Sequence, residues 1–168
     1  PLLQDGPLPV SGRAGGPCRL TRFDLASGRA DHQIAYQPDP VHFAAWLGSG
    51  LGGENGISEI LMLDDHQLLV LERAYVPGRG ASLCLYRIDT REASPTLAQD
   101  ALRPGSYRAA PKTLVADFAR LGLGRVDNTE AMCWGPPLPS GRRSLVCVSD
   151  DNFNPLQVTQ FLAFEYLG

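Results

Sequence analysis

Lysine is almost absent from this chain, because 14 of its 15 basic residues are arginines and Lys112 is the exception. The sequence also lacks a basic tract, and its net charge of −3 at pH 7 argues against a nucleic-acid partner. No apolar run approaches the roughly 20 residues that a membrane-spanning helix needs. The hydrophobic fraction of 43% and charged fraction of 20% are those of an ordinary globular protein able to bury a core.

The four cysteines, Cys18, Cys84, Cys133 and Cys147, contain no CxxC pair, and their spacing argues against a zinc site. Their even number is compatible with disulfides in an oxidising compartment. Three of them lie within apolar runs, so buried free thiols explain the pattern equally well.

Short apolar runs separated by turn residues predict an all-β protein. We divide the chain into a loop-rich segment with a hairpin, residues 1–55, and a region of regular strands, residues 56–168. The expected strands are residues 18–25, 33–36, 57–63, 67–73, 82–88, 112–118, 129–134, 143–149 and 157–166.

An internal repeat indicates how these strands are arranged. Ser58-Glu59 opens one strand and Thr129-Glu130 opens another, and each is followed by a turn and a strand rich in Leu and Val. Repeated antiparallel meanders of this kind favour a β-propeller, although the same strands could form a sandwich.

The strand number is small for a complete propeller. The expected strands would make about 2–3 blades, whereas propellers usually have about four or more. We therefore expect an incomplete propeller, either the C-terminal part of a larger one or one completed by other chains. Its open sheet edges would favour self-association.

Carboxylates recur at the strand ends, where they are unusual. A strand-rich core excludes them unless they are paired, hydrogen-bonded or bound to a metal. The recurrence predicts a polar site built by strand ends. The motifs are Gly56-Ile57-Ser58-Glu59, Leu71-Glu72-Arg73, Asp127-Asn128-Thr129-Glu130 and Ser149-Asp150-Asp151-Asn152-Phe153.

These motifs, together with Pro111-Lys112 and residues 157–166, resemble the bacterial phytase-like family, described by the esterase-like activity of phytase. Ala131 stands where the family usually has glycine, and Asp151 where it often has asparagine. The resemblance covers about residues 56–166. It implies a propeller-like fold, a periplasmic or secreted location, and acidic residues that carry phosphoester chemistry.

Phosphoester hydrolysis requires a held phosphate, an activated water and help for the leaving group. Clustered carboxylates suit a hard cation such as Ca²⁺, and arginine offers a bidentate fork to phosphate. The substrate would be a small phosphorylated molecule. We expect catalytic roles for Glu59, Glu130 and Asp150, substrate-binding roles for Arg73, Lys112 and Asn152, and metal ligation by Glu59, Asp127, Glu130, Asp150 and Asp151.

Each of these residues also has a structural interpretation. Glu59 and Glu130 could bind backbone amides between blades, Glu72 could pair with a basic group at a strand end, and the Asp150–Asn152 run could be turn chemistry. Lys112 could be an inter-blade cation. The competing hypothesis is therefore a propeller scaffold or binding module that catalyses no reaction.

Overall fold

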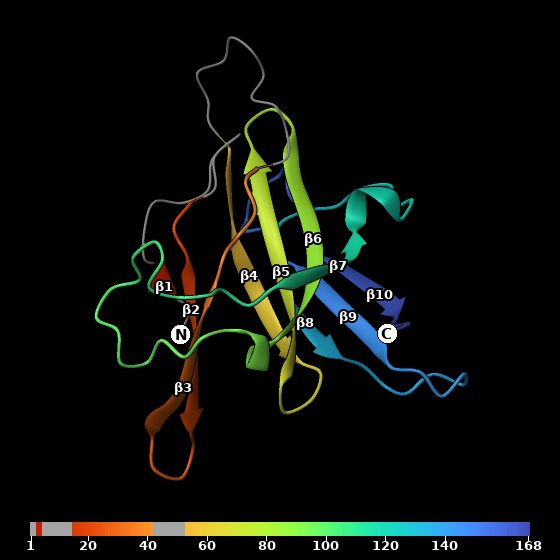
Figure 1. The fold of residues 1–168 in the computed structure, drawn as a ribbon. Helices are drawn as coiled ribbons and strands as arrows, with labels where there is room; N and C mark the ends of the chain where they lie inside the picture. The colour runs from red at the N-terminus through yellow and green to blue at the C-terminus, as the bar shows by residue number, and fades with distance from the viewer. Residues whose placement is uncertain (1–2, 5–14, 42–52) are drawn as a thin grey trace.

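The structure, a computed structural model, describes residues 3–4, 15–41 and 53–168. This part of the chain contains ten strands and two short 3-10 helices, and every strand pair is antiparallel (Figure 1). The all-β prediction is therefore confirmed. In chain order the elements are β1 (Leu3–Gln4), β2 (Cys18–Asp24), β3 (Arg29–Tyr36), β4 (Glu54–Met62), β5 (Gln67–Val76), β6 (Gly80–Asp89), η1 (Thr90–Glu92), β7 (Lys112–Asp117), η2 (Phe118–Arg120), β8 (Thr129–Trp134), β9 (Ser144–Ser149) and β10 (Gln160–Glu165).

The strands form three sheets, with the orders β1-β2-β3, β4-β5-β6-β7 and β10-β9-β8. The four-stranded sheet lies between the two three-stranded ones (Figure 1). Each sheet is a meander of sequence neighbours, as the repeat predicted. The arrangement is that of an incomplete, propeller-like all-β fold.

Strand β5 explains why the middle sheet is covered on both faces. Its run of apolar residues is continuous, which is typical of a strand buried on both sides. Leu68 and Val70 pack toward the first sheet, whereas Leu69 and Leu71 pack toward the third. Successive side chains of a strand point to opposite faces, so one strand contributes to two cores.

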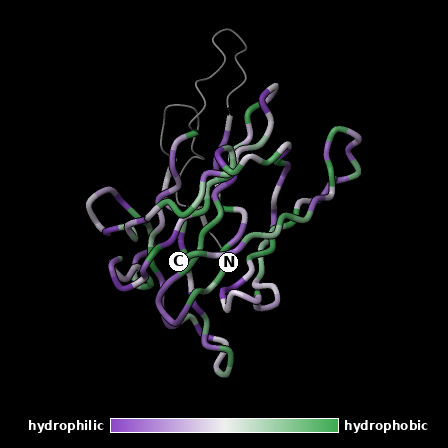
Figure 2. Tube along the Cα trace, turned by 90° about the vertical axis from the view of Figure 1, so that its right-hand side faces the viewer, coloured by the Kyte–Doolittle hydropathy of each residue, from purple (hydrophilic) through white to green (hydrophobic). Residues whose placement is uncertain are grey.

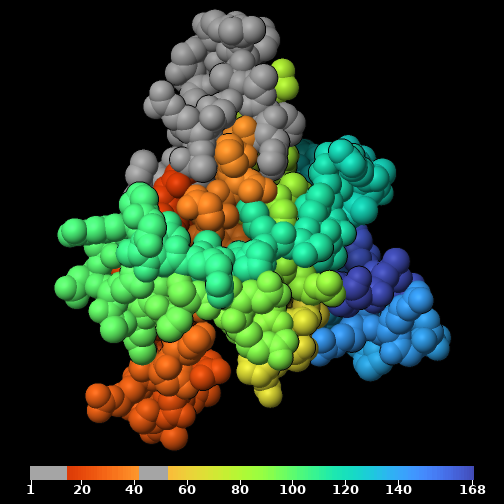
Figure 3. All heavy atoms as spheres, viewed as in Figure 1, coloured from red at the N-terminus to blue at the C-terminus, as the bar shows by residue number. Residues whose placement is uncertain are grey.

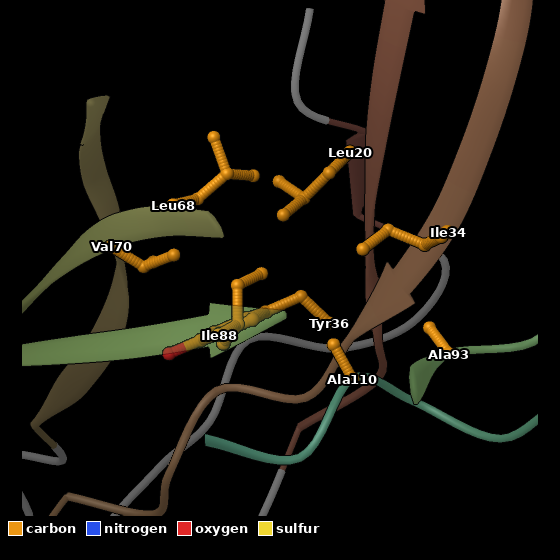
Figure 4. Packing of buried hydrophobic residues seen from close by; sticks show 8 residues of the cluster. All are labelled: Leu20, Ile34, Tyr36, Leu68, Val70, Ile88, Ala93 and Ala110. Carbon is orange, nitrogen blue, oxygen red and sulfur yellow. The ribbon is translucent and has the colours of Figure 1, made fainter. Parts of the chain in front are cut away.

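The first core joins the β2–β3 hairpin to the middle sheet. Figure 4 shows its side chains converging from β2, β3, β5, β6 and the segment that leads to β7. The members are Leu20, Ile34, Tyr36, Leu68, Val70, Ile88, Ala93 and Ala110.

The second core joins the middle sheet to the third. Phe118 of η2 and Phe164 of β10 meet edge to face, with ring centroids 5.4 Å apart. Figure 2 shows hydrophobic stretches along the central strands and hydrophilic residues at many turns. The other buried members are Leu69, Leu71, Leu83, Leu85, Met132, Leu145 and Cys147.

The strand boundaries agree with those expected to within a few residues, and the hairpin turn at Ser27-Gly28 is present, with Gly28 at a φ of +67°. Within the described residues, none of the four cysteines forms a disulfide bond. The proposed boundary between residues 55 and 56 stays a prediction. Much of the first segment, residues 1–2, 5–14 and 42–52, lies outside the described residues.

Candidate functional site

A cavity of about 330 Å³, lined mostly by polar residues, lies at the start of β4 and the end of β5. It brings together pieces of three predicted motifs, namely Gly56-Ile57-Ser58, Arg73 and Asn128, which are distant in sequence. The remaining lining residues are Glu54, Asn55, Tyr75 and Gln157.

Arg73 forms an ion pair beside this cavity. Its Nη1 lies 3.0 Å from Oε1 of Glu130, and the Asn128 amide donates to the same oxygen at 2.6 Å. The side chains of Arg73 and Glu130 are 29% and 44% exposed, so the pair is open to solvent. Among the described residues, the other guanidinium N–H groups of Arg73 and the second oxygen of Glu130 have no partner. The pair could therefore bind an oxyanion and a water molecule.

Two β-bulges distinguish the two copies of the repeated motif. The register skips Ser58 in β4 and Glu130 in β8. A bulge redirects the side chain of the extra residue, which fits the contact of Glu130 with Arg73 across the sheets. Glu59 is instead in register, and its carboxylate accepts the Ile60 N–H at 2.8 Å. The structure thus brings Glu130, but not Glu59, to Arg73.

Glu72 points away from Arg73, toward the first sheet, and its side chain is 2% exposed. Its carboxylate accepts hydrogen bonds from the Tyr36 hydroxyl at 2.6 Å and from the Asn55 amide at 2.7 Å. Lys112 Nζ lies 2.5 Å from the same carboxylate. Because a buried charge is tolerated only with such partners, Glu72 is a structural anchor, as its structural interpretation predicted.

The ammonium group of Lys112 is fully engaged in this network. Its ammonium also contacts Asp39 at 2.7 Å and the Gln37 carbonyl at 3.1 Å, and it lies 4.3 Å from the centroid of the Tyr86 ring. Burial, followed by the neighbouring carboxylates, raises the pKa of Tyr36 well above its ordinary value. Lys112 therefore bridges the first and middle sheets, does not line the cavity, and its predicted substrate-binding role stays a prediction.

Asp127 is also engaged. Its carboxylate accepts the N–H groups of Asn128 at 2.7 Å and Val158 at 3.0 Å, and Arg125 pairs with it at 2.8 Å. With a side chain only 9% exposed, it ties the segment before β8 to the segment before β10. Asp127 is therefore a structural anchor between these two segments.

The Asp150–Asn152 run forms a tight turn. Asp151 accepts the Phe153 N–H at 2.9 Å, and Asn152 and Phe153 have φ values of +50° and +55°. Asn152 lies 3.3 Å from the Gln157 side chain, which lines the cavity. Left-handed backbone at two successive non-glycine residues is uncommon, and asparagine tolerates it best.

The five predicted metal ligands belong to the separate groups of contacts described above and do not converge on one point. In the ranges that the structure describes, no group of three or more His, Cys, Asp or Glu side chains is placed to hold a metal ion. These carboxylates therefore form no ready-made ion site within the described residues, and no step below depends on an ion. Calcium binding stays a prediction.

Sequence reasoning did not identify Asn55, which lines the cavity and is buried. Its amide nitrogen donates to Glu72 and to the Asp39 carbonyl, while its Oδ1 has no hydrogen-bond partner within the described part of the chain. The sequence signal that could have identified Asn55 is an asparagine near the start of an apolar strand. Asn55 couples the buried ion pair to the cavity wall.

The fold and site together define a class, that of propeller-like all-β proteins with a cavity at strand ends and an arginine–glutamate pair beside it. The family model Phytase-like, described as esterase-like activity of phytase, matches residues 1–153, and the chain belongs to this family. The match includes the N-terminal segment, which the resemblance over residues 56–166 does not cover. No curated protein and no solved structure matched the chain. None of the helices in the described residues has the length and hydropathy to cross a bilayer.

Proposed function

We propose that this chain acts in phosphoester hydrolysis and that the cavity beside Arg73 receives the phosphate group. The observation that carries the proposal is the solvent-open pair of Arg73 and Glu130, held by Asn128 at the edge of the cavity. Membership of the phytase-like family supports a phosphoester hydrolase-like function. The substrate is a small phosphorylated molecule.

Each member of the pair has a defined role in this proposal. The N–H groups of Arg73 bind phosphate oxygens and stabilise the charge that develops there. Glu130 orients a water molecule and takes its proton as the oxygen attacks phosphorus. The bond from phosphorus to the ester oxygen breaks, and that oxygen takes a proton from solvent. Asn128 keeps the Glu130 carboxylate in position through the 2.6 Å hydrogen bond.

The test is hydrolysis of a chromogenic phosphomonoester by the parent chain and by Arg73→Gln. We expect kcat/KM to fall by about 100-fold or more, because an oxyanion-stabilising donor typically contributes that much. Arg142→Gln is the matched control, since Arg142 is exposed and outside the cavity lining. Equal activity of the parent and Arg73→Gln would refute the site.

Calcium assistance and a periplasmic or secreted location are further parts of the proposal. The recurrent carboxylates of the sequence support the first, and the resemblance to the family supports the second. A calorimetric Ca²⁺ titration of the folded chain, repeated on Glu130→Gln, tests the first. Saturable binding that the variant loses would support a metal at the cavity. An absence of binding to the folded parent would remove the metal from the proposal for this chain.

The second candidate is a scaffold that catalyses no reaction. The full engagement of Glu72 and Asp127 favours it, because both carboxylates are saturated by cations, hydroxyl or amide donors and backbone N–H groups. A folded parent chain that neither hydrolyses the ester nor binds inorganic phosphate would support the scaffold over the enzyme.

A further inference from the structure

A groove separates the end of the β2–β3 hairpin from the turns of the middle sheet. It consists of two adjoining cavities of about 200 and 270 Å³, which share Arg22, His32 and Thr90 in their linings. Figure 3 shows the hairpin end, in orange, projecting from the body with a hollow beside it. Among the residues that the structure describes, none lines both the groove and the cavity beside Arg73.

The smaller cavity has an apolar floor. Leu20, Ile34 and Leu68 form it, and all three are core residues that lie together in Figure 4. Ile60 and Met62 complete its wall, and Met62 is 49% exposed. Exposed apolar surface next to a core favours contact with an apolar ligand.

The larger cavity is lined by basic groups. Arg22 and Arg91 line it together with two of the three histidines of the chain, His32 and His66. No acidic side chain is among its lining residues in the described part of the chain. The residue types at this end of the groove therefore offer N–H donors to an anionic group.

Carboxylates outside this lining hold both guanidinium groups. Arg22 donates through Nε to Asp31 at 2.8 Å, and Arg91 donates through Nε and Nη2 to Asp89. Among the described residues, both Nη groups of Arg22 and the Nη1 group of Arg91 have no partner. A guanidinium that is fixed on one side and open on the other loses little freedom when it binds an anion.

We propose that this groove binds a small amphiphilic anion, with its apolar chain over Leu20, Ile34 and Met62 and its carboxylate or phosphate head against Arg22 and Arg91. The site is independent of the proposed hydrolytic function. Asp65 lines the apolar cavity and opposes the anion, so this residue limits the affinity.

Calorimetric titration of the full chain with hexyl phosphate, hexanoate, hexanol and inorganic phosphate tests the proposal. We expect at least one hexyl anion to bind more tightly than hexanol and inorganic phosphate, because only the amphiphilic probes fill both cavities. Comparison of hexyl phosphate with hexanoate identifies the preferred head group.

Four variants then assign the contacts. Arg22→Gln should weaken hexyl anion binding by about tenfold, the equivalent of one charge-assisted hydrogen bond. Met62→Ser should weaken the hexyl anions and leave inorganic phosphate unchanged. Asp65→Asn should strengthen binding of the anions, since it removes a like charge. Arg29→Gln is the matched control, because Arg29 is exposed on the same hairpin and lies outside both linings.

The variants are on exposed side chains, so they should leave the fold intact, which circular dichroism can verify. The proposal is overturned if the parent binds none of the anions. It is equally overturned if Arg22→Gln and Arg29→Gln have the same effect, or if Asp65→Asn weakens binding.

Discussion

Replacing Lys112 by methionine should strongly destabilise the chain, because it leaves the Glu72 carboxylate buried without its cation. The Glu72 side chain is 2% exposed and that of Lys112 is 16% exposed. Methionine keeps most of the length and apolar volume of the lysine side chain. The substitution therefore removes the charge with little change in packing.

The expected magnitude follows from the contacts that remain. Breaking a buried ion pair by removing one partner costs about 3–5 kcal/mol. Tyr36, Asn55 and the Asp39 N–H still donate to Glu72 after the change, and Lys112 is partly exposed. We therefore expect the lower end, about 3 kcal/mol of the free energy of unfolding.

Urea unfolding at neutral pH, followed by circular dichroism, measures this loss. A cycle with Glu72→Gln and the double variant isolates the pairwise term, which should be about 1–3 kcal/mol for residues in one network. Arg142→Met is the control, since its partner Glu165 is exposed and the distance is 3.4 Å. That exposed pair should contribute about 0–1 kcal/mol.

A loss below about 1 kcal/mol for Lys112→Met would refute the reasoning, because it would equal that of a surface pair. A coupling energy near zero in the double-mutant cycle of Lys112 and Glu72 would also refute it. Either result would show that the pair of Lys112 and Glu72 contributes no more than a surface ion pair.

Three further outcomes are expected. Asp127→Asn should lower the free energy of unfolding by about 1–3 kcal/mol and increase hydrogen exchange in the segment before β10; unchanged exchange would contradict the anchoring role. Iodoacetamide at pH 8 should label the exposed Cys133 but not the buried Cys147. The reason is that burial raises the pKa of the Cys147 thiol to about 12. Equal labelling of the two cysteines in the native protein would contradict this expectation. The side-chain hydrogen bond from Arg91 lowers the pKa of Asp89 from 3.8 to about 2, so its stabilising contribution is present above pH 3.8 and is lost as the pH falls through about 2. Arg91→Gln should return this pKa toward 3.8 in an NMR titration, and an unchanged value would exclude Arg91 as the cause.

Local patterning predicted most of the strands correctly. The Ser27-Gly28 turn, the run Leu68–Leu71 and the strand that starts at Lys112 all follow from alternation and turn chemistry, which act within a few residues. Burial of β5 on both faces was also encoded locally, because its run contains no solvent-facing position before Glu72. The family match agrees with motifs that are visible in the sequence.

The candidate site was predicted only in part. Arg73, Asn128 and Glu130 were among the motifs, but nothing in the sequence indicated that they meet while Glu59 does not. That difference depends on the residue at which each bulge falls, Ser58 in β4 and Glu130 in β8. A shift of one residue in register moves a side chain to the other face of a sheet, and pairing partners are distant in the sequence.

The sequence by itself determined the strands, the two faces of β5 and the opposite directions of Glu72 and Arg73, because these depend on neighbours along the chain. Tertiary structure alone decided what each charged group meets. Glu72 contacts Lys112 from the edge of its own sheet and Tyr36 from the next sheet, and Arg73 contacts Glu130. The exposed Arg22 lines the same cavity as His66. Such pairings depend on how sheets stack, and the stacking is set by the summed burial of many apolar side chains rather than by any local pattern.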